Sequence, residues 1–120
     1  MKTWAVVGLG NNPERAAFGV AKLLQDKGHR IIPVYPRAET VHGEVGYKTL
    51  SEILGPVDVV DCFVNSTLVG KVVDEAIAIG AKAVWLQLDV IDNDAIARAQ
   101  AAGLITVMDR CPAIEYRKKS

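Results

Sequence analysis

The feature that most constrains the fold is an apolar segment, residues 5–7, that ends in a glycine-rich polar loop and is followed by a helical pattern. This is the strand–loop–helix order that opens a Rossmann-type unit. The first turn of such a helix leaves backbone N–H groups free and carries the positive end of the helix dipole, so it attracts a phosphate group. Gly8 and Gly10 let a ligand approach the backbone closely. We therefore expect an anion-binding loop at residues 8–15.

The details of this loop argue against NAD as the ligand. The dinucleotide fingerprint G-x-G-x-x-G needs its third glycine at position 13, where this chain has Pro13. The acidic residue that binds the ribose 2′-hydroxyl of NAD is missing at the end of the second strand, where Arg37 stands instead. An arginine suits a phosphorylated ribose better than an unmodified one. The alternative is that the two glycines only form a tight turn, because short glycine motifs also occur by chance.

Strands alternate with helices along the chain. We expect strands at residues 3–8, 29–36, 57–63, 83–88 and 104–108, and helices at residues 16–27, 51–54, 66–79 and from 92 or 93 to 102. The alternation predicts a three-layer, Rossmann-like, doubly wound fold, in which helices cover both faces of a parallel five-stranded sheet of strand order 3-2-1-4-5. This order places a ligand crevice at the carboxyl ends of strands one and four. We expect residues 1–120 to form one domain.

Composition excludes several classes of function. The chain has 14 Lys and Arg against 14 Asp and Glu, and this balance gives no sign of a nucleic-acid or membrane partner. We expect no signal peptide, and the sequence holds no apolar run of membrane-spanning length. Two cysteines do not make a disulfide framework, so we expect a reducing, cytoplasmic compartment. No Cys, His and Asp spacing resembles a metal site. We expect residues 116–120 to be an exposed tail. The protein is either a monomer or a homo-oligomer, and its sequence leaves both open.

Stretches spread over nearly the whole chain carry a family resemblance. They are AVVGL at 5–9, PER at 13–15, PV and PR within 33–37, GE at 43–44, VDVVD at 57–61, GAKAVWLQ at 80–87 and DRCP at 109–112. On these stretches the chain resembles the small bacterial and archaeal CoA-binding proteins, which are similar to the CoA-binding domain of succinyl-CoA synthetase. The resemblance implies a cytosolic CoA-binding domain without an enzymatic reaction, with phosphates at the first loop and adenosine near the end of strand two. Gly8, Gly10, Arg15 and Arg37 are then the candidate CoA-binding residues.

Other positions depart from the family pattern, and nearly all of them fall at the carboxyl edge of the expected sheet. They are Gly10, Ala16, Ala17, Tyr35, His42, Cys62, Val64, Asn65 and Asp89. A pocket that changes while its scaffold is kept indicates re-purposing, by nature or by engineering. Gly10 lacks the hydroxyl that the family usually has there, and Tyr35 crowds the adenosine side. We therefore expect CoA to bind weakly or not at all.

Two of these departures, Cys62 and His42, could form a catalytic dyad. An imidazole beside a thiol removes its proton and stabilises the thiolate nucleophile. Cys62 lies near the end of strand three, and His42 lies in the loop that leaves strand two, which the expected order places next to strand three. The remaining candidates are oxyanion donors near Gly10, Asn11, Asn65 and Ser66, small pocket residues Ala16 and Ala17 beside Tyr35, and Asp89 or Glu44 to orient His42.

Two hypotheses from different classes follow. The first is a cysteine hydrolase of activated esters, acting through an acyl-enzyme on Cys62, that needs no cofactor. The second is a non-catalytic binder of CoA or acyl-CoA. Taken singly, a cysteine in a buried strand is usually a small hydrophobic residue, and a loop histidine is usually solvated. The partner is in either case a small molecule, an ester or a CoA-like ligand.

Overall fold

The computed structural model describes residues 2–111, so the tail at 116–120 lies outside the described residues. The elements, in chain order, are β1 (Thr3–Val7), α1 (Ala16–Asp26), β2 (Arg30–Val34), the 3-10 turn η1 (Leu50–Glu52), β3 (Val59–Cys62), α2 (Ser66–Ala78), β4 (Ala83–Leu86), α3 (Asn93–Ala101) and β5 (Ile105–Val107). The three α-helices agree closely with those expected. The helix expected at 51–54 is the single turn η1.

All five strands pair in parallel, in the order β2-β1-β3-β4-β5. The expected order 3-2-1-4-5 is wrong. β3 pairs with the free edge of β1, where Trp4 lies opposite Val59, and does not pair with β2. β2 is therefore an edge strand, and β1 lies between β2 and β3.

A proline within β2 and the chain segment around Tyr47 prevent a further strand from pairing with the outer edge of β2. Pro33 lies inside β2 and has no N–H to donate, which restricts such a strand to the edge of a sheet. The carbonyl of Pro33 accepts a hydrogen bond from the N–H of Tyr47 (2.9 Å), and the carbonyl of Tyr47 accepts one from the N–H of Tyr35 (2.9 Å). The segment around Tyr47 thus covers this edge before the chain crosses to the other side of β1.

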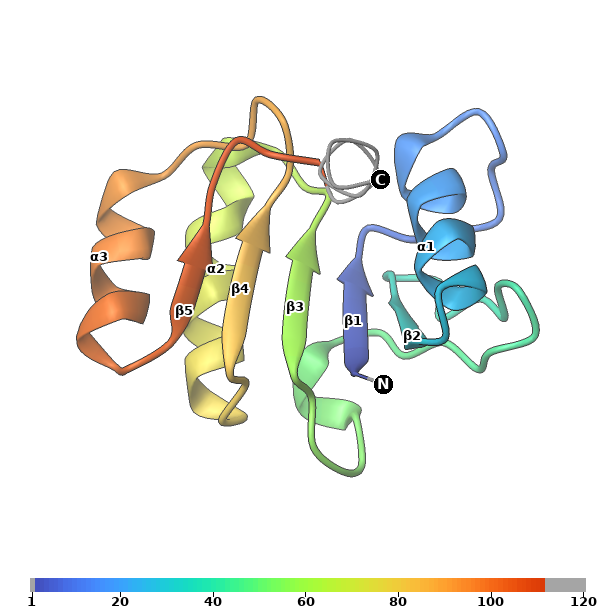
Figure 1. Cartoon of the computed structure of the whole chain (residues 1–120), viewed down its shortest axis with the longest axis horizontal. Coiled ribbons are helices and arrows are strands. Elements are labelled where there is room, and N and C mark those ends of the chain that lie inside the picture. Colours follow the sequence, from blue (N-terminus) through green and yellow to red (C-terminus); the bar gives the residue numbers. More distant parts are fainter. Residues whose placement is uncertain (1, 112–120) are drawn as a thin grey trace.

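Helices cover both faces of the sheet (Figure 1). α1 buries Ala17, Val20, Ala21 and Leu24 on one face, against Trp4 and Val6 of β1 and Ile31 of β2. α2 and α3 cover the other face, where Val69, Val73, Ala95 and Ala99 pack against Ala5, Val7, Val60 and Cys62. Side chains alternate across each strand, so neighbouring residues belong to different cores. Within residues 2–111, no helix has the length and apolar character that crossing a membrane requires.

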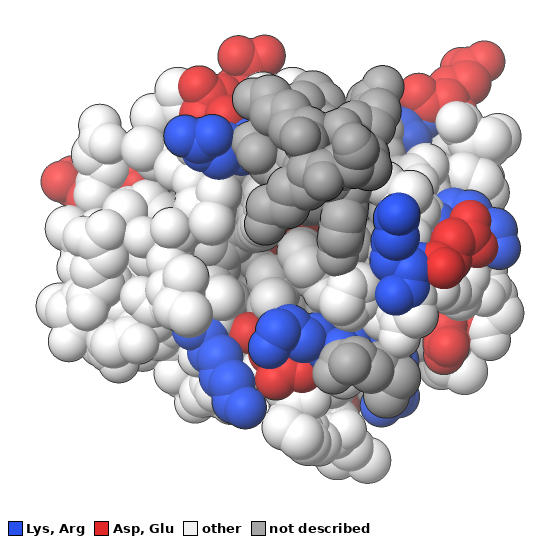
Figure 2. Space-filling view, in the orientation of Figure 1, with Lys and Arg blue, Asp and Glu red and all other residues white. Residues whose placement is uncertain are grey.

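The α1 side of the sheet is only partly covered by helix. In the described part of the chain, α1 lies over β1 and β2, and no helix lies over the same face of β4 and β5 (Figure 1). Ile105 of β5 is 69% exposed. Figure 2 shows that the surface over β4 and β5 carries few charged side chains.

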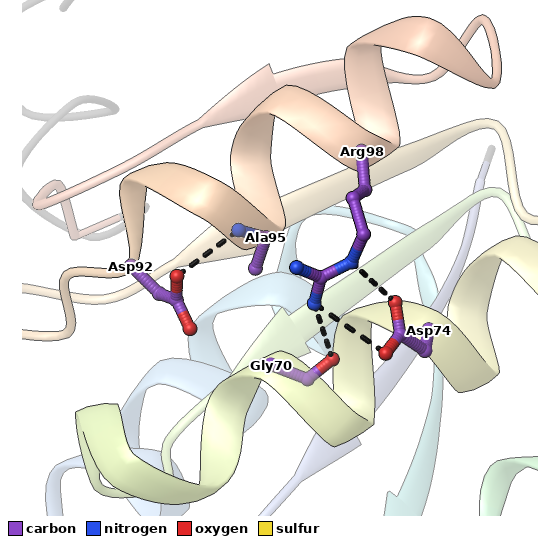
Figure 3. A network of polar contacts seen from close by, with 5 residues as sticks. All are labelled: Gly70, Asp74, Asp92, Ala95 and Arg98. Atoms are coloured by element: carbon purple, nitrogen blue, oxygen red, sulfur yellow. Dashed lines mark hydrogen bonds and ion pairs between the residues drawn. The ribbon is translucent and has the colours of Figure 1, made fainter.

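The two helices on the opposite face are joined by a polar network (Figure 3). Arg98 of α3 donates from Nε to Oδ1 of Asp74 on α2 (2.8 Å) and from Nη2 to the carbonyl of Gly70 (3.4 Å). A Cβ at Gly70 would lie 3.0 Å from Oδ2 of Asp92, so the glycine allows the close approach of α2 and α3. Asp92 also caps α3 by accepting the N–H of Ala95 (3.0 Å).

The strand order fixes where a ligand enters. β1 leads to α1 on one face and β3 leads to α2 on the other, so the loops at the carboxyl ends of these adjacent strands diverge. Open α/β sheets bind their ligands at such a topological switch point. The crevice therefore lies between β1 and β3, and not between strands one and four as expected.

Candidate functional site

The loop after β1 is built on a glycine that no other residue can replace without strain. Gly8 has φ +99°, and a Cβ there would collide with the backbone carbonyl of Phe63, which follows β3. The N–H of Gly8 donates to the carbonyl of Val34 in β2 (2.8 Å). Gly8 thus brings the ends of β1, β2 and β3 together and sets the floor of the crevice.

The helix that follows this loop has an open N-terminus. The N-cap of α1 is Arg15, whose side chain makes no capping hydrogen bond, and the first turn holds no acidic residue. The other two helices are capped, α2 by Asn65 and α3 by Asp92. The N–H of Phe18 donates to the carbonyl of Arg15 (3.1 Å), so the N–H groups of Ala16 and Ala17 are the ones that remain available to an anion from outside, which the helix dipole also favours.

Three cavities meet at Gly8 and Arg15. The polar cavity, about 470 Å³, is further lined by Gly10, Asn11, Asn12, Pro13, Tyr35, Arg37 and Glu39. The apolar cavity, about 530 Å³, is lined mainly by Val7, Val34, Tyr35, Pro36, Phe63, Val64, Leu68 and Val72, with Asn65, Lys48, Lys71 and Glu75 around them. The inner cavity, about 220 Å³, is lined by Ala16, Ala17, Phe63, Val64, Gln87, Leu88 and Val90. The two larger volumes are typical of ligand pockets, about 300–1,000 Å³.

The charges around these cavities favour an anionic ligand. Arg15, Arg37, Lys48 and Lys71 line them, and within residues 2–111 none of these four cations forms an ion pair. Two carboxylates, Glu39 and Glu75, line the same cavities. The cations therefore outnumber the carboxylates, and a polyanion would find uncompensated positive charge here.

A buried carboxyl lies directly behind the inner cavity. Asp61 of β3 is fully buried between β1 and β4, and its Oδ1 accepts a hydrogen bond from Nε2 of Gln87, which lines the cavity. Its Oδ2 has no hydrogen-bond partner. Burial raises the pKa of Asp61 to about 7, and the hydrogen bond from Gln87 opposes that rise.

The structure does not bring Cys62 and His42 together. Cys62 is fully buried in the core under α2 and α3, and its Sγ contacts the carbonyl of Val60 (3.9 Å). His42 lies on the α1 side, where its Nε2 donates to the carbonyl of Phe18 (2.9 Å) and its ring packs on the Phe18 ring. The expected proximity depended on the wrong strand order, because β1 separates β2 from β3.

The environment of Cys62 also opposes thiolate formation. Burial, and secondly the nearby carboxyl of Asp61, raise the pKa of the Cys62 thiol above that of a free cysteine. A nucleophilic cysteine needs the opposite shift, and it needs exposure to its substrate. In the described residues, no group of three or more His, Cys, Asp or Glu side chains could hold a metal ion.

Most of the other residues expected at the site do lie at the carboxyl edge. Gly8, Gly10, Asn11, Ala16, Ala17, Arg15, Tyr35, Arg37 and Asn65 line the three cavities. Ser66 and Asp89 do not line them. The Ser66 hydroxyl joins the carbonyl of Asp89 (3.3 Å) to the N–H of Ile91 (2.9 Å), a contact that holds the loop after β4 against the start of α2. Glu44 pairs through its backbone with Val41.

Sequence reasoning missed several residues of the site. Glu39, Lys48 and Lys71 lie in loops or on an exposed helix face, where a charged side chain carries no distinctive signal. Asp61 did carry one, because it is an acidic residue inside the apolar pattern of a buried strand.

Comparisons with known families, proteins and structures identify the family of this chain. The model of the CoA binding domain matches residues 2–117. The uncharacterized protein YneT of Bacillus subtilis is 34% identical over 110 residues, which are 92% of this chain and 82% of that protein. A hypothetical protein from Pyrococcus horikoshii OT3 and Prb, the PH1109 protein redesigned for binding, each show 38% identity and a TM-score of 0.93, over 98% of this chain and 82% of theirs. The chain belongs to the CoA-binding domain family, which confirms the resemblance read from its sequence.

Proposed function

We propose that this protein is a non-catalytic binder of CoA or acyl-CoA. The observation that carries the proposal is the uncapped N-terminus of α1, which opens with Arg15 into a cavity that also holds Arg37. CoA carries a diphosphate and a ribose phosphate, and free N–H groups with arginines are the donors that such groups require. Family membership supports the same ligand.

Each part of CoA has a matching region in the crevice. The diphosphate suits the junction at Gly8 and Arg15, where all three cavities meet. The adenosine and its ribose phosphate suit the polar cavity beside Tyr35 and Arg37. The pantetheine arm or an acyl chain suits the apolar cavity, whose walls include Phe63 and Leu68.

The esterase hypothesis finds no comparable support. Its nucleophile is buried under two helices, and its proposed base is held by a backbone carbonyl on the other side of the sheet. Binding without chemistry is therefore the function that we put forward.

Calorimetric titration with CoA tests the proposal. It is run at low ionic strength, where contacts between phosphates and exposed cations are strongest. Arg15→Gln should weaken CoA binding about 10- to 100-fold, because a charge-assisted hydrogen bond is lost. Arg30→Gln is the matched control. Arg30 is exposed at the amino end of β2, away from the cavities at the carboxyl ends of the strands, so its replacement should leave the affinity unchanged.

Two results would contradict the proposal. One is an absence of binding by the parent protein at millimolar CoA. The other is an equal loss of affinity in Arg15→Gln and Arg30→Gln, which would show that only the overall charge of the protein matters.

A further inference from the structure

One carboxylate already occupies part of the anion-binding loop. Oε1 of Glu39 accepts a hydrogen bond from the backbone N–H of Asn11 (3.1 Å), in the loop between β1 and α1. Glu39 belongs to the loop that leaves β2, and it lines the polar cavity together with Arg15 and Arg37. A carboxylate on a backbone N–H is the same kind of contact that a ligand phosphate makes.

The position of this carboxylate depends on Gly10. A Cβ at residue 10 would lie 2.8 Å from Oε1 of Glu39, closer than two such atoms normally approach. Because Gly10 has no side chain, the Glu39 carboxylate can occupy the space beside it. Tyr35 flanks the same space, since its ring carbons would lie 3.6 Å from that Cβ.

Two further contacts hold Glu39 in place. Nδ2 of Asn11 donates to the carbonyl of Thr40 (2.7 Å), which ties the first loop to the residue after Glu39. The backbone carbonyl of Glu39 lies against Gly46, where a Cβ would collide with it. The carboxylate is thus presented to the loop from a backbone that is fixed on both sides.

We propose that Glu39 acts as an internal anion, which a phosphate group of the ligand must displace from the N–H of Asn11. This inference rests on the proposed function, because it assumes that the ligand is a phosphate-bearing molecule such as CoA. Glu39 competes twice: it occupies a donor of the loop, and its negative charge offsets that of Arg15 and Arg37 in the same cavity. It sets the affinity of the site low and selects for ligands whose phosphates can outcompete it.

Two variants remove the competitor in different ways. Glu39→Gln keeps the size and the acceptor atom but removes the charge. Gly10→Ala places a Cβ in the space that the Glu39 carboxylate occupies and forces the carboxylate away, adds no hydroxyl that could bind a phosphate, and leaves the charge in the chain. Glu44→Gln is the matched control, because Glu44 lies in the same loop and lines none of the three cavities.

The experiment is calorimetric titration of the parent and the three variants with CoA and, separately, with inorganic pyrophosphate. Glu39→Gln and Gly10→Ala should each bind CoA about tenfold more tightly than the parent, with a similar gain for pyrophosphate. Glu44→Gln should match the parent. Thermal unfolding of each variant confirms that it is folded before titration.

The outcomes separate this inference from the proposed function. If the parent binds CoA and Glu39→Gln binds it equally or more weakly, Glu39 supports the ligand and the inference is overturned while the function stands. If neither the parent nor Glu39→Gln binds CoA at millimolar concentration, both are overturned. A gain in Glu44→Gln equal to that in Glu39→Gln would also overturn the inference, because net charge alone would then explain it.

Discussion

Replacing Asp61 by asparagine should stabilise the protein at neutral and alkaline pH. Asp61 is fully buried, one of its carboxyl oxygens has no partner, and its pKa is raised from 3.8 to about 7, chiefly by desolvation. At 1.36 kcal/mol per pH unit, this displacement corresponds to about 4 kcal/mol of destabilisation when the folded protein must hold the charged form. Asp61→Asn keeps the shape and the acceptor for Gln87 without the charge.

The sign of the pH dependence follows from the raised pKa. Between pH 3.8 and about 7 the folded protein holds a proton on Asp61 that the unfolded chain releases. The stability of the parent therefore falls as the pH rises through this window, and this contribution is constant above it. Asp61→Asn should exceed the parent in stability by up to about 4 kcal/mol at pH 8, and the difference should approach zero near pH 4.

Chemical denaturation followed by circular dichroism, at a series of pH values from 4 to 8.5, measures this difference. Asp58→Asn is the control of opposite sign. The N–H of Thr3 donates to Asp58 (2.8 Å) and lowers the pKa of that carboxyl, so its loss should destabilise the protein at pH 7 and matter less as the pH falls. A gain in Asp61→Asn that is the same at pH 4 and pH 8, or no gain at pH 8, would refute the reasoning.

Three further predictions concern the scaffold and the cysteines, and the first two are measured by chemical denaturation. Gly8→Ala should lower the free energy of unfolding by about 1–3 kcal/mol, because Gly8 has a positive φ. Gly19 lies on α1 with open space around it, so Gly19→Ala should raise the free energy of unfolding by about 0.5–1 kcal/mol. Equal effects of the two variants would contradict the account of the β1 loop. Arg98→Gln should lower the stability only slightly, and less at high salt, since the ion pair of Arg98 with Asp74 is exposed; a loss independent of salt would argue against an electrostatic origin. Cys62→Ala should leave any hydrolysis of an activated aryl ester unchanged, and loss of an ester burst in this variant would restore the hydrolase hypothesis. In the folded protein, a thiol reagent should label half-buried Cys111 before it labels buried Cys62.

The local structure of this chain was largely predictable from its sequence. The apolar stripe of α1 at Ala17, Val20, Ala21 and Leu24 is buried as its helical spacing predicts. The glycines that follow the helices have the positive φ of helix-ending residues, as at Gly28 (φ +90°). These features depend on residues close together in the chain, and so they are visible in sequence.

The strand order was not predicted correctly. It depends on whether β3 pairs with β2 or with the free edge of β1, and neighbouring residues in the sequence do not determine that choice. Pro33 marks β2 as an edge strand, but the expected order 3-2-1-4-5 places this strand between strands one and three. The error carried over to the site. It placed His42 beside Cys62, whereas His42 packs on α1 and Cys62 faces α2 across the sheet. Tertiary contacts such as that of Glu39 with Asn11 leave no pattern in the sequence.

The most direct test of the central claim is an NMR titration of the labelled protein with CoA, following the backbone amide signals. The account predicts that the largest shifts fall in the loop and first turn at residues 8–18, with further shifts at Tyr35 and Arg37. Signals from α3 should not move, because this helix packs on the opposite face of the sheet and lines none of the three cavities. Shifts centred on α3, or none at millimolar CoA, would contradict a CoA site at the β1–α1 loop.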